Sequence, residues 1–181
     1  MEATSDVIHE VPGLYQVIRF IPLRRTPNVS FDFFPIRAIS RIDAIDRVMH
    51  GPGAFSPGSV GAVERPWYMH PDQDDHLIVL HGTRDIEIYT SAHGKVERFT
   101  AEADRIEVNG SLLYDGPAAL VWPRGVFHRV VSREFGSASL NLATHYEGFD
   151  ISTNFNVYDL DTDSGRYECV REGQLDQGGG A

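Results

Sequence analysis

Five side chains suited to metal binding or proton transfer stand at informative spacings. Tyr68 and His70 are two residues apart, so an extended strand directs both to one face. Asp75 and His76 are adjacent, so a regular strand cannot aim both at one point. His128 follows a Pro-x-Gly turn further along the chain. A divalent metal needs three or more nitrogen or oxygen donors converging at roughly 2.0 to 2.3 Å, whereas a tyrosine beside a histidine suits acid–base catalysis.

These residues must be positioned by strands, because short apolar runs and turn formers alternate closely after residue 63. Such a pattern without intervening helices predicts an all-β sandwich or barrel in a single domain spanning residues 1–181. We expect a short helix at Ile39–Met49, where apolar residues recur at helical spacing, and a disordered tail from about residue 174 to 181. Earlier strands are expected at Leu14–Leu23 and Phe31–Ile36. The later strands are expected at 63–70, 76–82, 85–90, 95–100, 119–122, 126–131 and 137–145.

Two segments resemble the paired motifs of the cupin superfamily. The first runs from Gly61 to Gly82. The second runs from Gly116 through Pro123-Arg124-Gly125 to His128, with one extra residue before the proline and Ser132 where the family has asparagine. The resemblance implies a double-stranded β-helix, the jelly-roll barrel, with the short helix preceding both motifs. It says little about activity, because this fold hosts many functions.

The family register, counted back from Gly82, implies a metal site of His70, Asp75 and His128. Two histidines and one carboxylate suit iron(II) or manganese(II), and nickel or zinc also remain open as the divalent ion. A bulge in the strand would replace Asp75 by His76. Tyr68 occupies the position of the family's first histidine and is a poor ligand at neutral pH. Tyr68 and His70 are therefore our candidate catalytic pair.

A second likeness concerns the RmlC-like branch of nucleotide-sugar epimerases and ketoisomerases. It rests on residues 70–73, 77–82 and 122–128. Together these features predict a small-molecule enzyme with one divalent metal, of the oxygenase or sugar/keto-acid isomerase type. The alternatives are a metal-free sugar epimerase or isomerase and a non-catalytic barrel that binds a small ligand.

The amino-acid composition indicates which classes of binding partner are disfavoured. The net charge of −10 and the pI near 5.1 disfavour nucleic acids and anionic membranes. Cys169 is the single cysteine, so no intrachain disulfide forms. No basic segment followed by an apolar run opens the chain, and we expect a cytoplasmic protein. The segment Leu14–Leu23 is apolar on both faces, which predicts a homodimer formed through this strand or an exposed sheet face.

Overall fold

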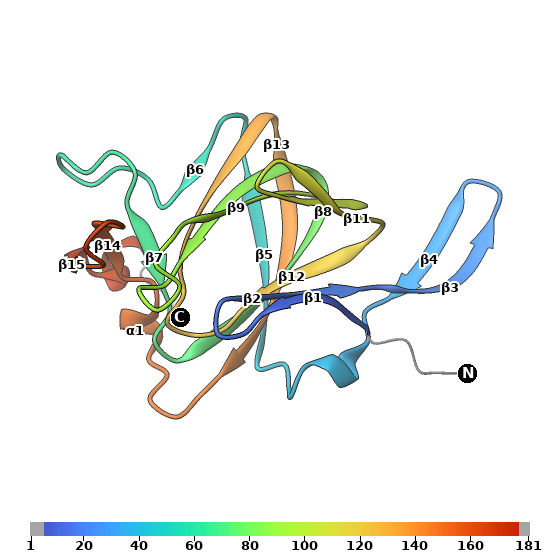
Figure 1. Ribbon diagram of the computed structural model, residues 1–181, viewed down its shortest axis with the longest axis horizontal. Coiled ribbons are helices and arrows are strands. Elements are labelled where there is room, and N and C mark those ends of the chain that lie inside the picture. Colours follow the sequence, from blue (N-terminus) through green and yellow to red (C-terminus); the bar gives the residue numbers. More distant parts are fainter. Residues whose placement is uncertain (1–5, 178–181) are drawn as a thin grey trace.

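The computed structural model describes residues 6–177, and they form an almost entirely antiparallel β structure (Figure 1). The predicted all-β barrel is confirmed. The strands are β1 (Val7–Val11), β2 (Tyr15–Arg19), β3 (Ile21–Thr26), β4 (Val29–Phe33), β5 (Ala44–His50), β6 (Phe55–Ser56), β7 (Trp67–Met69), β8 (Gln73–Tyr89), β9 (Glu97–Glu102), β10 (Arg105–Val108), β11 (Ser111–Asp115), β12 (Ala118–Trp122), β13 (Phe127–His145), β14 (Val157–Leu160) and β15 (Tyr167–Arg171).

Two long strands, β8 and β13, pair along most of their length and run through both halves of the barrel (Figure 1). Each was expected to be two shorter strands. Instead each strand is continuous through a bend, which lies at Gly82 in β8 and near Gly136 in β13. Both glycines have positive φ, and a Cβ atom on Gly82 would collide with the carbonyl oxygen of Gly136. The bends therefore need glycine for conformation and for space.

Strand β2 is covered on both faces within one chain. Tyr15 and Val17 belong to the core inside the barrel, whereas Ile18 belongs to a second core on the outer face. Residues that pack over that outer core include Phe34 and Ile39. The double apolar face is thus accounted for without a second copy, and the homodimer stays a prediction.

The helix expected at Ile39–Met49 is wrong. Residues 44–50 form strand β5, whose exposure alternates residue by residue and which pairs with β13. Asp46, Val48 and His50 line a cavity inside the barrel, while Ile45 and Met49 are exposed. Because the inward face mixes polar and apolar residues, the two-residue period is hidden in the sequence, and a chance helical spacing stands out instead.

Helical structure in residues 6–177 is limited to short turns. A 3₁₀ turn, η1, spans Ile36–Ala38 before the motifs, and the short helix α1 (Ile151–Asn154) follows them. A second 3₁₀ turn, η2, spans Gly173–Asp176, inside the tail expected to be disordered. Residues 178–181 of that tail lie outside the described residues. None of the described helices is long and apolar enough to cross a bilayer.

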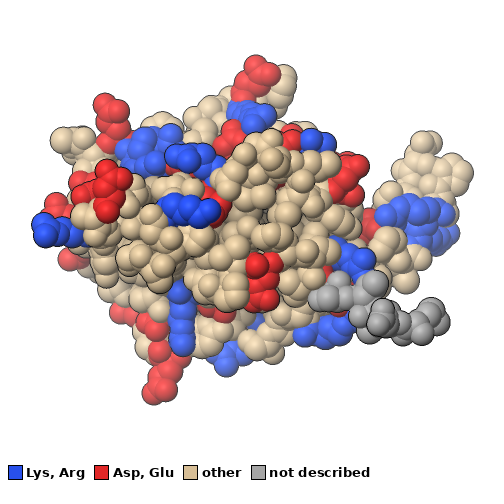
Figure 2. All heavy atoms as spheres, viewed as in Figure 1, with Lys and Arg blue, Asp and Glu red and all other residues tan. Residues whose placement is uncertain are grey.

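The hairpin β3–β4 stands away from the barrel as a separate two-stranded sheet (Figure 1). Its exposed apolar side chains include Leu23, Val29 and Phe31. The hairpin carries the basic residues Arg24 and Arg25 and projects at the right of the view in Figure 2.

Candidate functional site

Three neighbouring strands position the candidate residues. Tyr68 lies in β7, His70 follows the end of that strand, and His128 stands one residue into β13, directly opposite Tyr68. Asp75 lies in β8. The Pro-x-Gly turn ties the two motifs together, because the backbone N–H of Gly125 donates to the carbonyl oxygen of His70 at 2.8 Å.

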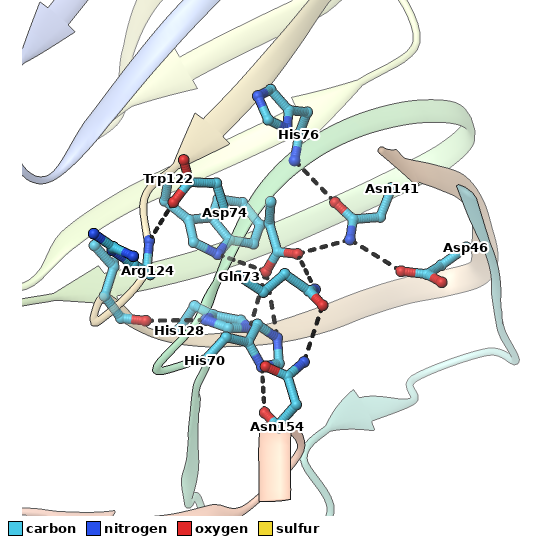
Figure 3. A network of polar contacts seen from close by, with 12 residues as sticks. Asp46, His70, Gln73, Asp74, His76, Trp122, Arg124, His128, Asn141 and Asn154 are labelled. Carbon is cyan, nitrogen blue, oxygen red and sulfur yellow. Dashed lines mark hydrogen bonds and ion pairs between the residues drawn. The ribbon is translucent and has the colours of Figure 1, made fainter. Parts of the chain in front are cut away.

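The structure brings together the three predicted metal ligands, His70, Asp75 and His128. One ligand atom from each lies within 4.8 Å of the others, and all three residues are buried. Asp75 Oδ2 is 3.3 Å from His70 Nε2 and 3.9 Å from His128 Nε2. Figure 3 shows the two imidazole rings close together beneath the polar network, and their centroids are 4.8 Å apart.

The second nitrogen of each imidazole fixes its orientation. His70 Nδ1 donates to the carbonyl oxygen of Asn154 at 2.5 Å, and His128 Nδ1 donates to that of Val126 at 3.2 Å. In the neutral form of each ring this places the lone pair on Nε2. Two imidazole lone pairs and a carboxylate oxygen then face one another. Either a proton shared with the carboxylate or a cation relieves this arrangement, so the donor set fits a divalent metal.

Asp75 is held by neutral donors. Its Oδ1 accepts hydrogen bonds from the amides of Gln73 and Asn141, each at 2.7 Å, and its Oδ2 accepts one from Trp122 Nε1 at 3.0 Å. Burial raises the pKa of Asp75, but His70 and other neighbours outweigh it, and the pKa lies below its usual value. The carboxylate is therefore ionised at neutral pH.

Sequence reasoning missed the residues that support this carboxylate. Asn141 bridges two acids, because its Nδ2 also donates to Asp46 at 3.2 Å (Figure 3). Asn154 donates to Gln73 Oε1 at 3.0 Å. Gln73 could have been found, since it lies two residues before Asp75 and shares its face of the strand. Asn141 and Asn154 come from distant segments and have no such signal.

His128 and Tyr68 have opposite pKa shifts with the same main cause. Burial and, to a smaller extent, the neighbouring His70 lower the pKa of His128 to about 4, so His128 is neutral at pH 7. Burial raises the pKa of Tyr68, which keeps its hydroxyl protonated. The Tyr68 ring lies 6.0 Å from the His128 ring and 6.3 Å from the His70 ring, centroid to centroid.

His76 faces the other side of β8. Its Nδ1 donates to the carbonyl oxygen of Leu142 at 2.7 Å, and its side chain lines a cavity of about 400 Å³ on the outer face of the barrel. Only its backbone N–H contacts the inner network, through Asn141 Oδ1 at 2.9 Å. The structure thus places Asp75, and not His76, beside the two histidines.

The three candidate ligands line an inner cavity of about 350 Å³. Its walls are mixed: Tyr68, Leu77 and Phe155 contribute apolar surface, whereas Arg84 and His50 contribute polar groups that sequence reasoning did not single out. A concave site with a few convergent polar groups is typical of small-molecule binding.

No family model matches the chain, and no curated protein matches it. Several solved structures share its fold. A variant of the 3,4-ketoisomerase QdtA from Thermoanaerobacterium thermosaccharolyticum, in complex with TDP-4-keto-6-deoxyglucose, is 15% identical. The alignment covers 78% of this chain and 85% of the QdtA chain, with a TM-score of 0.51.

Two epimerases give similar agreement. A doubly substituted form of ChmJ, a 3'-monoepimerase from Streptomyces bikiniensis in complex with dTDP, is 11% identical over 77% of this chain and 67% of its own, with a TM-score of 0.55. NovW, a 4-keto-6-deoxy sugar epimerase from Streptomyces spheroides, is 12% identical. The alignment covers 83% of this chain and 74% of NovW, with a TM-score of 0.54. Identities this low speak for fold alone. The chain therefore has the RmlC-like cupin barrel fold that these sugar-modifying enzymes share.

Proposed function

We propose that this protein is an isomerase or epimerase that moves a proton on a small keto-sugar or related keto compound inside the barrel. The observation that carries the proposal is the buried cluster of His70, Asp75 and His128 in the wall of the inner cavity. The fold shared with sugar ketoisomerases and epimerases favours this reaction class over the oxygenase alternative.

The chemistry is removal of a proton from the carbon next to a carbonyl group, followed by its return to another carbon or the opposite face. His70 Nε2 is the proposed base, and Asp75 Oδ2 at 3.3 Å stabilises the imidazolium that forms. Tyr68 keeps its proton at neutral pH and is the proposed donor to the carbonyl oxygen. Return of the proton to carbon restores the neutral imidazole, and Tyr68 takes back a hydroxyl proton when the enol collapses to the ketone, so the cycle balances.

As an alternative to this metal-free route we propose a divalent metal, because the donor set fits one. His70 Nδ1 already donates to Asn154, so His70 Nε2 would then bind the ion and would not act as the base. His70, Asp75 and His128 would hold the ion, and it would supply Lewis-acid polarisation of a substrate oxygen. The hydrogen bonds from Nδ1 of each histidine to backbone carbonyls support this role, since they resemble the outer contacts that orient metal-binding histidines.

The test is deuterium incorporation from heavy water into TDP-4-keto-6-deoxyglucose, the ligand of the QdtA structure. Metal-stripped protein is assayed alone and with iron(II), manganese, nickel or zinc. We expect deuterium at the carbon beside the ketone, and a loss of rate of about 10²- to 10⁴-fold in His70→Asn. His76→Asn is the matched control and should retain the wild-type rate.

Absence of incorporation by the wild-type protein under all of these metal conditions would reject this substrate. If a panel of free and phosphorylated keto-sugars and keto acids also exchanged no deuterium, the proposed isomerase would be wrong. Measurable binding without exchange would then favour the non-catalytic barrel that binds a small ligand.

A further inference from the structure

The inner cavity contains a buried cation whose charge no carboxylate in the described residues neutralises. Arg84 of β8 is 2% exposed and lines the cavity. Its Nε donates to Ser137 Oγ at 2.8 Å, and its Nη2 donates to the carbonyl oxygen of Val48 at 3.3 Å. Both partners are neutral, and no ion pair within 4 Å is formed between this guanidinium and an acid of residues 6–177.

Nearby arginines behave differently. Arg129 and Arg98 both pair with Glu87, at 2.5 and 2.9 Å, and Arg133 pairs with Asp85 at 2.8 Å. All three are more exposed than Arg84, so water could have solvated them without a partner. The least hydrated of these four cations is therefore the one that lacks an anion, in a chain whose net charge is −10.

Burying a charge without a partner is unfavourable. Burial lowers the pKa of Arg84 to about 10, which still leaves the guanidinium charged at neutral pH. A charge kept at such a cost and directed at a cavity is better explained by a ligand than by packing, because an apolar side chain would fill the same space more favourably.

A chain of hydroxyl groups holds this guanidinium in place. Ser137 Oγ, which accepts from Arg84, lies 2.6 Å from Ser132 Oγ, and Ser132 Oγ lies 3.0 Å from His50 Nδ1. Arg84 Nη1 makes no hydrogen bond to the described residues, so its two N–H groups are available to a ligand. A fixed guanidinium with free N–H donors matches the geometry of a carboxylate or phosphate.

The distance between Arg84 and the histidine cluster sets how long a ligand must be to contact both. Arg84 pairs with Ser132, four residues along β13 from His128. Four residues of an extended strand span about 13 Å, before the reach of the side chains is subtracted. His128 and Val130 line the cavity along this path. One end of the cavity is thus a histidine and carboxylate cluster, and the other end is cationic.

We propose that Arg84 binds an oxyanion of the ligand, a carboxylate or a phosphate, several ångströms from the atoms that contact His70 and His128. The inference rests on the proposed function only in placing the ligand in this cavity. It narrows the substrate class to anionic compounds, such as sugar phosphates, sugar acids or the diphosphate of a nucleotide sugar.

The test is the thermal unfolding midpoint of metal-stripped protein, measured against increasing inorganic phosphate or malonate at constant ionic strength set with chloride. We expect one of these anions to raise the wild-type midpoint in a saturable manner. Phosphate and malonate distinguish a phosphate site from a carboxylate site. Arg84→Met should weaken the apparent anion affinity by at least about tenfold, the loss expected for a charged hydrogen-bond partner.

Two further variants make the result decisive. Arg47→Gln is the matched control, because Arg47 is exposed on the opposite face of β5 beside Val48, and it should respond to anions as the wild type does. Arg84→Lys keeps the charge without the planar fork and should retain a weakened response. If Arg84→Met does not fold, the anion response of Arg84→Lys is measured in its place.

The proposal is wrong if neither anion shifts the wild-type midpoint, or if the Arg84 variants respond to anions as the wild type does. It is supported if the response is lost while Arg84→Met in anion-free buffer unfolds no earlier than the wild type, since a purely structural arginine would lower that midpoint. The anion response does not depend on turnover. An Arg84-dependent shift without deuterium exchange would reject only the isomerase, and exchange without such a shift would reject only the oxyanion site.

Discussion

The two faces of strand β8 make an instructive comparison, because adjacent residues enter two different cavities. Asp75 points into the inner cavity of about 350 Å³, and His76 points into the outer one of about 400 Å³. The larger cavity is not where the candidate ligands gather. Within the described residues, the one group of three potential metal ligands with ligand atoms within 4.8 Å of one another lies on the inner side.

The difference lies in how polar groups are partnered. On the outer face, Asp74 accepts hydrogen bonds from the Tyr146 hydroxyl at 2.7 Å and from the Arg124 backbone N–H at 2.8 Å. Its partners thus lie within the chain. On the inner face, the lone pairs of His70 and His128 face a carboxylate, which leaves a site for a proton or a cation. Cavity size alone therefore does not separate the two faces, whereas the partners of their polar groups do.

The largest contrast between the two faces should appear in metal affinity. His70→Ala or His128→Ala should weaken binding of a divalent ion by more than about 100-fold, because losing a ligand costs more than losing an outer contact. His76→Ala should bind as the wild type does. Elemental analysis and metal titration of the purified variants provide the measurement. Equal losses in His76→Ala would mean that the inner cluster is not the metal centre.

Removal of Asn141 should cost the most stability among the supporting contacts. Asn141→Ala deletes hydrogen bonds to Asp75 and Asp46 and leaves the two acids without the amide between them. We expect a loss of about 3 kcal/mol in the free energy of unfolding. Urea denaturation at pH 7 measures it. A loss below about 1 kcal/mol would show that the bridge contributes little.

Acidification should destabilise the metal-free protein through the inner histidine more than through the outer one. The folded pKa of His128 is about 4, below the unfolded value near 6.5. The unfolded chain therefore binds more protons between these values, and stability is lost as pH falls from 6.5 towards 4, by up to ~3 kcal/mol.

His128→Gln should flatten this part of the stability profile. His76→Gln should flatten it less, although burial lowers the pKa of His76 in the same direction. Denaturation series at several pH values provide the comparison. A slope unchanged by His128→Gln would contradict the assignment of a neutral, buried imidazole.

The smallest expected difference concerns the two aromatic donors to acids. Trp122→Phe removes the N–H that reaches Asp75 Oδ2 in the buried network, and Tyr146→Phe removes the hydroxyl that reaches Asp74. We expect about 1 to 2 kcal/mol for the first and under ~1 kcal/mol for the second, because water can replace the more exposed donor. Thermal denaturation with both single variants would rank them, and the reverse order would overturn the comparison.

Part of the candidate site could be predicted from local patterns. The spacing of Tyr68 and His70 and the Pro-x-Gly turn before His128 indicated residues that do share the inner cavity. The inward position of Arg84 can also be predicted from the sequence. Arg84 stands in phase with Ile86 and Ile88, which are buried, so a two-residue period already placed a charge on an inward face. The strand β5 could not be recognised, because its inward residues Asp46, Val48 and His50 mix polar and apolar side chains and hide the two-residue period.

The sequence by itself determined the β-rich architecture and the short-range pairs, because strand periodicity and turn chemistry act over a few residues. Only the tertiary structure decided which distant groups meet. Asn141 reaches Asp75 across 66 residues of chain, Asn154 reaches His70 across 84, and no acid among residues 6–177 pairs with Arg84. Such contacts depend on the closure of the barrel and on the register of β8 against β13, and no local pattern encodes either.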